Sequence, residues 1–355
     1  MTLPGAGRPR LRVGIIGTGN IAQNHARGYV AAGAEIVALA DPSAPALSRR
    51  AAEWGVARTF ADYRDLLALP DVDAVSVSTP NAVHGPVTLA AAAAGKHVLC
   101  EKPVSLSLDE GRAMIDACQQ AGVILQVNHH LRANRSVQRV RELLDAGSLG
   151  RVTFIRLRQA HDWGGATEIP PSFRTAALAG GGTLLDNGCH LFDLARHLGG
   201  PITETYARAA TLKYAAEVED TAVTSLRFAS GALGQVETQW TATGWEMTFA
   251  VYGTEGAVEY SDRIGRPVLR WVHRGGGNAS WADPEVTTWE GGGVTDHTRA
   301  VSAFVTAVRG EGPVICSGED GLEAVRLALA SYESAGRNAP VALVSAAPVA
   351  PGVAS

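Results

Sequence analysis

The stretch that decides the fold runs from Leu11 to Ala22 and reads Leu-Arg-Val-Gly-Ile-Ile-Gly-Thr-Gly-Asn-Ile-Ala. Its first six residues are typical of a buried strand, and a helical pattern follows over residues 20–32. Gly17 permits a tight turn, Gly19 lets the backbone approach a pyrophosphate, and Ala22 is small enough for close helix–strand packing. This pattern, in its strand–turn–helix context, predicts a dinucleotide-binding site. The residues expected to contact the cofactor here are Gly17, Gly19, Asn20 and Ile21.

An acidic residue follows the next strand. The apolar run at residues 36–40 ends at Asp41, which is the spacing at which a carboxylate binds the hydroxyls of the adenosine ribose. A carboxylate there repels a 2′-phosphate, and residues 42–44 supply no arginine; Arg49 and Arg50 lie further along the chain. We therefore expect NAD rather than NADP as the cofactor.

The pattern of apolar runs divides the chain into two parts. Short apolar runs alternate with helical patterns up to residue 127, which predicts a doubly wound α/β domain of the Rossmann type with a parallel sheet. Longer strand-like runs follow at residues 152–160, 222–228, 232–240, 247–252 and 257–260, with turn signals between neighbours. They predict an α+β domain with a large, open, mostly antiparallel sheet. We expect a cofactor-binding domain at 1–128, a substrate-binding and oligomerisation domain at 129–344, and a flexible tail at 345–355.

Helical patterns are expected in the second part as well. They cover residues 136–146, 190–197, 298–309 and 319–334, and the last three are expected to pack on the second sheet. Residues 275–293 are rich in Gly and Trp, which predicts a loop with one short strand. Because helices cover only one face of such a sheet, we expect the chain to form oligomers.

Composition excludes several classes of protein. The 355 residues exceed one ordinary core, and the net charge of −4 gives no global positive field for nucleic acid or anionic lipid. The four cysteines lie far apart, which favours reduced thiols in a cytoplasmic protein over a zinc site or a disulfide framework. The N-terminus has no apolar signal-peptide core, and no apolar run is long enough to span a bilayer.

Two further stretches are more specific than the glycine motif. They are Ser-Thr-Pro-Asn-Ala-Val-His at residues 78–84 and Ala-Gly-Lys-His-Val-Leu-Cys-Glu-Lys-Pro at residues 94–103. The chain resembles the Gfo/Idh/MocA family of sugar and polyol oxidoreductases, which includes glucose-fructose oxidoreductase and inositol dehydrogenase. The similarity covers nearly the whole chain and continues through Gly-Gly-Gly-Thr-Leu-Leu-Asp-Asn-Gly-Cys-His at 180–190 and Tyr-Gly-Thr-Glu-Gly at 252–256.

The resemblance implies a set of catalytic residues. In the family, the lysine of Glu-Lys-Pro lies beside the nicotinamide, and the Asp and His of the glycine-rich stretch complete the site; by match these are Lys102, Asp186 and His190. It also implies a cis bond before Pro103 and a homodimer or homotetramer formed through the second sheet. The chemistry is reasonable by itself, because alcohol oxidation needs a base such as histidine, and a lysine stabilises negative charge on the reacting oxygen.

Asp186 and His190 are four residues apart, so they share one face if the segment is helical. A carboxylate beside the imidazole would then raise the pKa of the histidine. These two residue types also bind zinc, but no third ligand at metal spacing is evident nearby, and we expect no metal.

A polar group follows the strand that ends at Ser78. Because this strand belongs to the parallel sheet, these side chains are expected to face the nicotinamide half of the cofactor, together with Glu101 and Lys102. An alternative role for Asn81, compatible with the first, is to cap the following helix. The group consists of Thr79, Pro80, Asn81 and His84.

The substrate side is less well defined. By position relative to the family, His129, His161 and Trp163 line the sugar pocket together with Lys102, Asp186 and His190. Trp163 and Trp240 are candidates for stacking on a sugar ring, although a packed or surface tryptophan is an equal alternative for each. Arg132, Arg135 and Arg139 have the spacing of one helical stripe that would suit a phosphorylated sugar. A solvated helix face paired with Glu142 and Asp145 is favoured, and the substrate is therefore expected to be uncharged.

The resulting hypothesis is an oxidoreductase that moves a hydride between a nicotinamide and a ring carbon bearing a hydroxyl or keto group in a sugar, cyclic polyol or sugar derivative. An alternative is an NAD-dependent glycosidase or lyase that acts by transient oxidation and elimination, with no net formation of NADH. A third possibility is a non-catalytic NAD-binding sensor, which the presence of Lys102, Asp186 and His190 disfavours.

Overall fold

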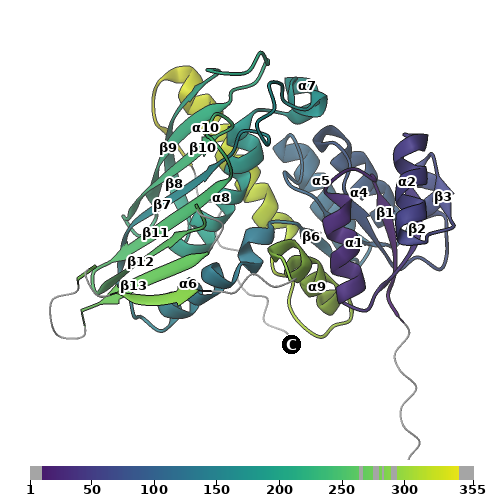
Figure 1. Cartoon of the computed structure of the whole chain (residues 1–355), viewed down its shortest axis with the longest axis horizontal. Coiled ribbons are helices and arrows are strands. Elements are labelled where there is room, and N and C mark those ends of the chain that lie inside the picture. The colour runs from purple at the N-terminus through teal and green to yellow at the C-terminus, as the bar shows by residue number, and fades with distance from the viewer. Residues whose placement is uncertain (1–9, 264–266, 275–279, 282–283, 289–293, 344–355) are drawn as a thin grey trace, which may run out of the picture.

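The structure is a computed structural model that describes residues 10–263, 267–274, 280–281, 284–288 and 294–343. The expected tail at 345–355 and much of the expected loop at 275–293 lie outside these residues. Two sheets stand apart in the molecule, and helices fill the space between them (Figure 1). Within the described residues, no helix is long and apolar enough to cross a membrane.

The first sheet is the predicted doubly wound sheet. Its six strands are all parallel, in the order β3-β2-β1-β4-β5-β6. The strand order reverses between β1 and β4, which is where open α/β sheets bind their ligands. The strands are β1 (Arg12–Ile16), β2 (Glu35–Ala40), β3 (Thr59–Phe60), β4 (Ala74–Val77), β5 (His97–Cys100) and β6 (Leu125–Val127).

Helices cover both faces of this sheet. They are α1 (Ala22–Ala31), α2 (Ala44–Trp54), α3 (Tyr63–Leu67), the 3-10 turn η1 (Asn81–Val83), α4 (His84–Ala93) and α5 (Leu108–Gln120). All four residues of β4 are buried, as expected of a central strand covered on both faces. The side chain of Ser107 accepts a hydrogen bond from the backbone of Glu110 and so fixes the start of α5.

The second sheet has nine strands, in the order β14-β13-β12-β11-β7-β10-β9-β8-β15. All pairs are antiparallel except β7 with β10, which confirms a mostly antiparallel sheet. The strands are β7 (Val152–Ala160), β8 (Ile202–Ala210), β9 (Thr221–Phe228), β10 (Leu233–Gln239), β11 (Glu246–Gly253), β12 (Gly256–Ser261), β13 (Val268–His273), β14 (Glu285–Thr288) and β15 (Val341–Ala342).

Two long strands of this sheet, β8 and β13, were not predicted from the sequence. Strand β8 is interrupted by an irregularity in its pairing with β9 between Ile202 and Glu204, which breaks the alternation of buried and exposed residues. Strand β13 precedes the Gly- and Trp-rich segment, and it pairs with both β12 and β14. The expected short strand in that segment is β14.

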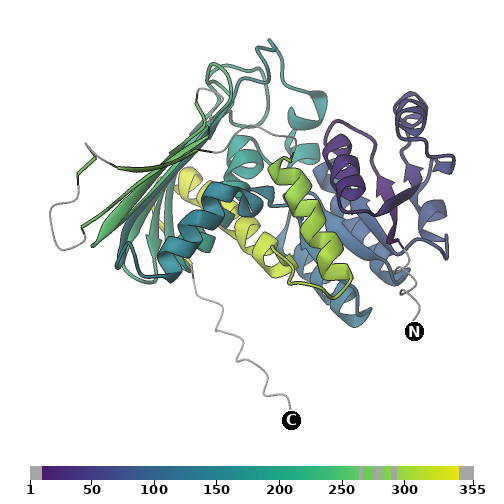
Figure 2. The same cartoon turned by 60° about the horizontal axis from the view of Figure 1, so that its bottom comes forward.

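Helices cover one face of the nine-stranded sheet, and in the part of the chain that the structure describes no helix covers the other (Figure 2). The helices on the covered face are α6 (Arg135–Asp145), α8 (Thr183–Gly199) and α10 (Gly318–Arg337). Phe192 of α8, Phe249 of β11 and Leu327 of α10 belong to the same buried cluster. Helix α8 begins seven residues before the predicted 190–197 segment and therefore includes Asp186.

The prediction that α9 (Asp296–Val308) packs on the second sheet is wrong. This helix lies beside α1 on the first domain (Figure 1), where Val301 and Phe304 join the core formed by β1 and α1. Gly28 explains the close approach, because a Cβ on this residue would overlap the side chain of Val301. The chain thus returns to the cofactor-binding part after building the second sheet.

Candidate active site

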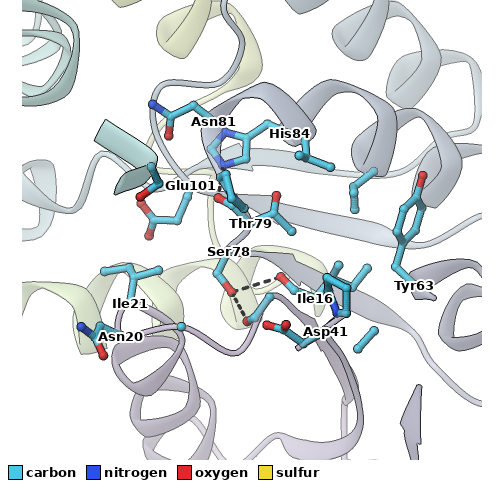
Figure 3. A pocket seen from close by; sticks show the side chains of 18 of the residues that line it. Ile16, Asn20, Ile21, Asp41, Tyr63, Ser78, Thr79, Asn81, His84 and Glu101 are labelled. Carbon is cyan, nitrogen blue, oxygen red and sulfur yellow. Dashed lines mark hydrogen bonds between the residues drawn. The ribbon is translucent and has the colours of Figure 1, made fainter. Parts of the chain in front are cut away.

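One large cavity, of about 940 Å³, lies at the carboxyl ends of β1, β2, β4 and β5. Figure 3 shows Tyr63 at one end of the drawn group, and Asn81 and Glu101 toward the other. Lys102, Asp186 and Trp163 also line the cavity, so it continues from the first domain to the second. The space therefore has a part suited to a dinucleotide and a part next to two ionisable side chains.

The glycine turn after β1 has the geometry that a pyrophosphate needs. Gly17 has a φ of 89°, and a Cβ there would overlap the carbonyl oxygen of Ser78, so the position requires glycine. Ser78 Oγ donates hydrogen bonds to the carbonyl oxygens of Ile16 and Gly17, at 3.2 and 2.8 Å (Figure 3). A Cβ on Gly19 would meet no atom within 4 Å, which leaves the backbone open to the cavity.

Asp41 lines the cavity at the end of β2. Its Oδ2 accepts hydrogen bonds from the backbone N–H and Oγ1 of Thr18, at 2.7 and 2.9 Å, and its Oδ1 accepts one from the backbone of Ser43 at 2.8 Å. Arg50 is buried beneath this turn, and its guanidinium binds Glu53 at 2.6 Å. These hydrogen bonds hold the Asp41 carboxylate in place, and in the described structure no arginine forms a salt bridge with it.

Three residues at this end of the cavity escaped the sequence analysis. Asp62, Tyr63 and Arg64 line the space where the chain enters α3. Arg64 pairs with Asp62 at 3.1 Å and lies over the ring of Tyr63. No motif marks them, because they are placed only by the packing of β3 beside β2.

The residues after β4 line the cavity (Figure 3). Asn81 does not cap a helix: its Nδ2 donates to the carbonyl oxygen of Ala179 in α7 (Ala176–Ala179), at 3.0 Å. The ring nitrogens of His84 lie 2.7 Å from the carbonyl oxygen of Pro103 and 3.0 Å from that of Thr79. His84 thus joins two loops that line the cavity, and burial lowers its pKa.

Glu101 is buried beside the cavity, and residues from distant parts of the chain hold it. Its Oε1 lies 2.7 Å from His25 Nε2 and accepts a hydrogen bond from Asn128 Nδ2 at 2.6 Å. Burial alone would raise the pKa of Glu101, but the contacts with His25 and Asn128 outweigh it and lower the pKa. The sequence analysis missed His25 and Asn128, because neither belongs to a recognisable motif.

Lys102 and Asp186 form an ion pair across the junction of the two sheets. Lys102 Nζ donates to Asp186 Oδ1 at 2.6 Å and to the backbone oxygen of Asp186 at 3.2 Å. Burial lowers the pKa of Lys102, but the carboxylate raises it more, and the net pKa lies above its usual range. The lysine is therefore a charged donor at neutral pH. The peptide bond between Lys102 and Pro103 is cis, as the resemblance implies.

His190 lies on α8 one turn after Asp186, as the helical reading predicted, but it does not line the cavity. It is 3% exposed, and its Nδ1 lies 3.3 Å from the Nδ1 of His129. The prediction of a raised pKa is wrong: burial lowers the pKa of His190 well below its usual value, and Lys102 and neighbouring histidines add to this effect. The imidazole is neutral and able to accept a proton.

The start of α8 is fixed by a residue that the sequence analysis missed. Glu219 accepts hydrogen bonds from the backbone of Gly182 at 3.0 Å, from the backbone of Leu184 at 2.7 Å and from the hydroxyl of Tyr332 at 2.9 Å. A Cβ on Gly182 would overlap the carbonyl oxygen of Glu219. The glycine run and this buried carboxylate together set where Asp186 stands.

Of the residues predicted to contact the substrate from the second domain, Trp163 lines the cavity, whereas His161 and Trp240 do not. Trp163 lines the cavity, with a positive φ of 55° and an indole Nε1 that has no hydrogen-bond partner in the described structure. Phe173, which sequence analysis missed, lines the cavity beside it. His161 packs between Trp163 and Trp245. Trp240 is fully buried against Trp163 and is thus a core residue.

The expected arginine stripe does not form. Arg132 lies in η2 (His130–Ala133), before α6, and its guanidinium binds both carboxylate oxygens of Asp193, at 2.8 and 2.6 Å. Arg139 pairs with Glu142 on the solvated face of α6, as was favoured. Asp193 lies close to His129 and Cys316, but both of its carboxylate oxygens already bind the Arg132 guanidinium, and we assign no metal to this group.

The comparisons with known proteins agree with this geometry. Residues 11–129 match the oxidoreductase family with the NAD-binding Rossmann fold, and residues 137–259 match the Gfo/Idh/MocA C-terminal domain. The chain belongs to the Gfo/Idh/MocA family of oxidoreductases. It is 34% identical to 1,5-anhydro-D-fructose reductase from Ensifer adhaerens, over 91% of this chain and 96% of that protein.

Two further relatives extend the comparison. Myo-inositol 2-dehydrogenase from Thermotoga maritima is 29% identical, over 91% of this chain and 96% of that protein. A solved structure of levoglucosan dehydrogenase in complex with NADH and levoglucosan has a TM-score of 0.86 and 26% identity, and the match covers 95% of this chain and all of that one. The family therefore includes enzymes of similar architecture that act on cyclic sugars and polyols.

Proposed function

We propose that this oxidoreductase transfers a hydride between NAD and a ring carbon of an uncharged sugar, cyclic polyol or sugar derivative. One observation carries the proposal: the Lys102–Asp186 pair stands in the same cavity as the glycine turn of β1. The substrates in the names of the relatives are cyclic polyhydroxy compounds, which supports the choice of substrate class.

The residues of the cavity fit a nicotinamide dinucleotide. We assign the pyrophosphate to the turn at Gly17 and Gly19, next to Asn20 and Ile21, because the backbone is open there and no side chain caps the start of α1. We assign the adenosine ribose to Asp41, whose negative charge opposes a 2′-phosphate and favours NAD. When bound, the nicotinamide would accept or donate the hydride.

We also assign roles to the residues at the nicotinamide end of the cavity. Thr79, Pro80, Asn81 and His84 form one wall of the nicotinamide pocket, and Glu101 and Lys102 close its base. Lys102 Nζ stabilises negative charge on the reacting oxygen, and Asp186 holds the ammonium in place and keeps it charged. We assign the hydroxyl proton to His190, which lies one helical turn from Asp186 and just outside the cavity lining; it would take the proton during oxidation and return it during reduction.

We assign the substrate contacts to the side of the cavity that the second domain builds. Trp163 lines the cavity and offers an aromatic ring, which suits the apolar face of a sugar. His129 and His161, which were predicted to contact the substrate, do not line the cavity; they pack behind it, against His190 and Trp163. Residues 1–128 thus supply the cofactor site, and residues 129–344 supply the substrate site and the oligomer interface.

The test is a panel of inositols, aldoses, anhydrosugars and glycosides, each assayed with NAD and with NADP at the absorbance band of the reduced cofactor. Net formation of NADH with at least one neutral cyclic substrate is expected. Cleavage of a glycoside without net NADH would instead favour the glycosidase alternative, which no relative described here supports. Turnover with phosphorylated sugars alone would contradict the assignment of an uncharged substrate.

We also propose a homodimer or homotetramer formed through the uncovered face of the nine-stranded sheet. Tyr206, Val223 and Leu233 lie on this face and are each more than a third exposed, which favours association. Light scattering that gives a monomer at micromolar concentration would refute it.

The four cysteines are free and buried, which supports a reducing cytoplasmic location.

A further inference from the structure

Three histidine rings stand in contact behind the Lys102–Asp186 pair, and we call them the histidine series. They are His190 of α8, His130 of η2 and His297 in the first turn of α9. The ring centroids of His190 and His130 are 4.7 Å apart at an interplanar angle of 80°, and those of His130 and His297 are 3.7 Å apart at 24°. Three separate elements supply the rings, so the series exists only at the junction of the two domains.

The histidine series connects a buried group to the surface. His190 is 3% exposed, whereas His130 and His297 are each partly exposed. The Nδ1 atoms of His130 and His297 are buried and lack a hydrogen-bond partner among the described residues. An unpaired polar atom in a buried position costs free energy, and two adjacent ones point to a role beyond packing.

The charges around the series act on its rings in opposite directions. Glu101 faces both His130 and His297 and favours their charged forms, while Lys102 opposes protonation of all three rings. His25 and Asp296 also face His297, with opposite effects on its charge, and His129 lies beside both His190 and His130. Burial is the largest effect and lowers the pKa of each ring, that of His297 to about 4.

We propose that His130 and His297 carry the reaction's proton between His190 and solvent while cofactor and sugar fill the cavity. The inference rests on the proposed function, in which the alcohol loses a hydride to the nicotinamide and one proton to His190. The substrate O–H bond breaks as an N–H bond forms on His190. That proton then passes to His130, to His297 and to water, and reduction runs the same steps in reverse.

Each proton transfer between neighbouring rings requires a hydrogen bond that the present ring orientations do not form. Hydrogen bonds lie in the plane of an imidazole ring, so transfer between a stacked or perpendicular pair needs a ring rotation or a bridging water. The unpaired Nδ1 atoms are available for such a bond. His130 and His297 act through His190 and do not touch the reacting carbon, so they are proton-transfer residues and not catalytic residues.

The first test replaces His297 by Phe, which keeps a ring against His130, and by Asn, which keeps polarity. With a substrate found in the panel, kcat in weak buffer is expected to fall at least about tenfold in both variants, less than the 10²–10⁴ typical of losing a direct general base. Added imidazole should restore kcat in the variants and leave the wild type unchanged. His273→Asn, an exposed histidine of β13, is the matched control.

Unchanged kcat in both variants, or a loss that imidazole does not restore, would overturn the proposal. A second measurement needs no substrate: the pH titration of the ring protons by NMR. Because charge on His297 opposes protonation of His190, the titration of His190 should move to higher pH in His297→Phe. An unmoved titration overturns the coupling, whereas a wild type inactive on the whole panel but with a coupled titration overturns only the proposed function.

Discussion

Replacing Lys102 by methionine tests the centre of the proposed site. Methionine keeps the length of the side chain and removes the charge and all three N–H donors. Two of those donors already bind Asp186, at its Oδ1 and its backbone oxygen. One donor therefore remains for the reacting oxygen, and the variant removes that single charged hydrogen bond together with the charge behind it.

The size of the effect follows from that count. Loss of one preorganised donor to a developing oxyanion typically costs about 2.7–4 kcal/mol, which corresponds to a fall in kcat of about 10²–10³-fold. The cofactor cradle at Gly17 and Gly19 belongs to a separate part of the cavity. Binding of NAD should therefore change far less than turnover, because Lys102 stands only at the nicotinamide end of the cofactor site.

The assay pairs steady-state turnover on the true substrate with NADH binding measured by fluorescence. Lys213→Met is the matched control, since Lys213 is exposed and lies outside the cavity lining. Lys102→Ala should behave like Lys102→Met, with cofactor binding retained and most turnover lost. Turnover of Lys102→Met within about tenfold of the wild type would refute the role assigned to this lysine.

Four further outcomes follow from the same contacts. In Asp186→Asn the carboxylate that raises the pKa of Lys102 is gone, so the alkaline limb of the kcat/KM profile should move to lower pH; an unmoved limb would contradict the pairing. In Asp41→Ser the ratio of kcat/KM with NADP to that with NAD should rise roughly tenfold, for a repulsion of about 1.4 kcal/mol, and an unchanged ratio would count against the assignment. Glu219→Ala leaves the Leu184 N–H and the Tyr332 hydroxyl without their acceptor, whereas the Gly182 N–H keeps the Tyr332 oxygen, so the free energy of unfolding should fall by about 2–6 kcal/mol in denaturant titrations; a loss below about 1 kcal/mol would mean that the two donors find other partners. The buried histidines, whose folded pKa values lie below the unfolded value of about 6.5, should make the Tm fall as pH falls from about 6.5 to 4, because the unfolded chain then binds more protons; His297→Phe should flatten this slope, and an equal slope in both proteins would contradict it.

The sequence by itself determined the part of the site that is local. The turn at Gly17, the acid at Asp41 and the residues after β4 are each placed by a strand that ends at the same edge of a parallel sheet. Such placement depends only on hydrophobic periodicity and turn chemistry, which neighbouring residues encode. The roles predicted for Lys102, Asp186 and His190 came instead from the resemblance of their sequence stretches to a known family.

Only the tertiary structure decided which side chains meet across the junction. The pairing of Lys102 with Asp186, the hold of Glu219 on α8 and the contact of His130 with His297 each join residues far apart in the chain. No periodicity encodes these contacts, because they depend on how α9 returns to α1 and how two sheets pack around shared helices. The same packing removes water from His190 and reverses the expected direction of its pKa shift, since burial outweighs a carboxylate that is already paired with lysine.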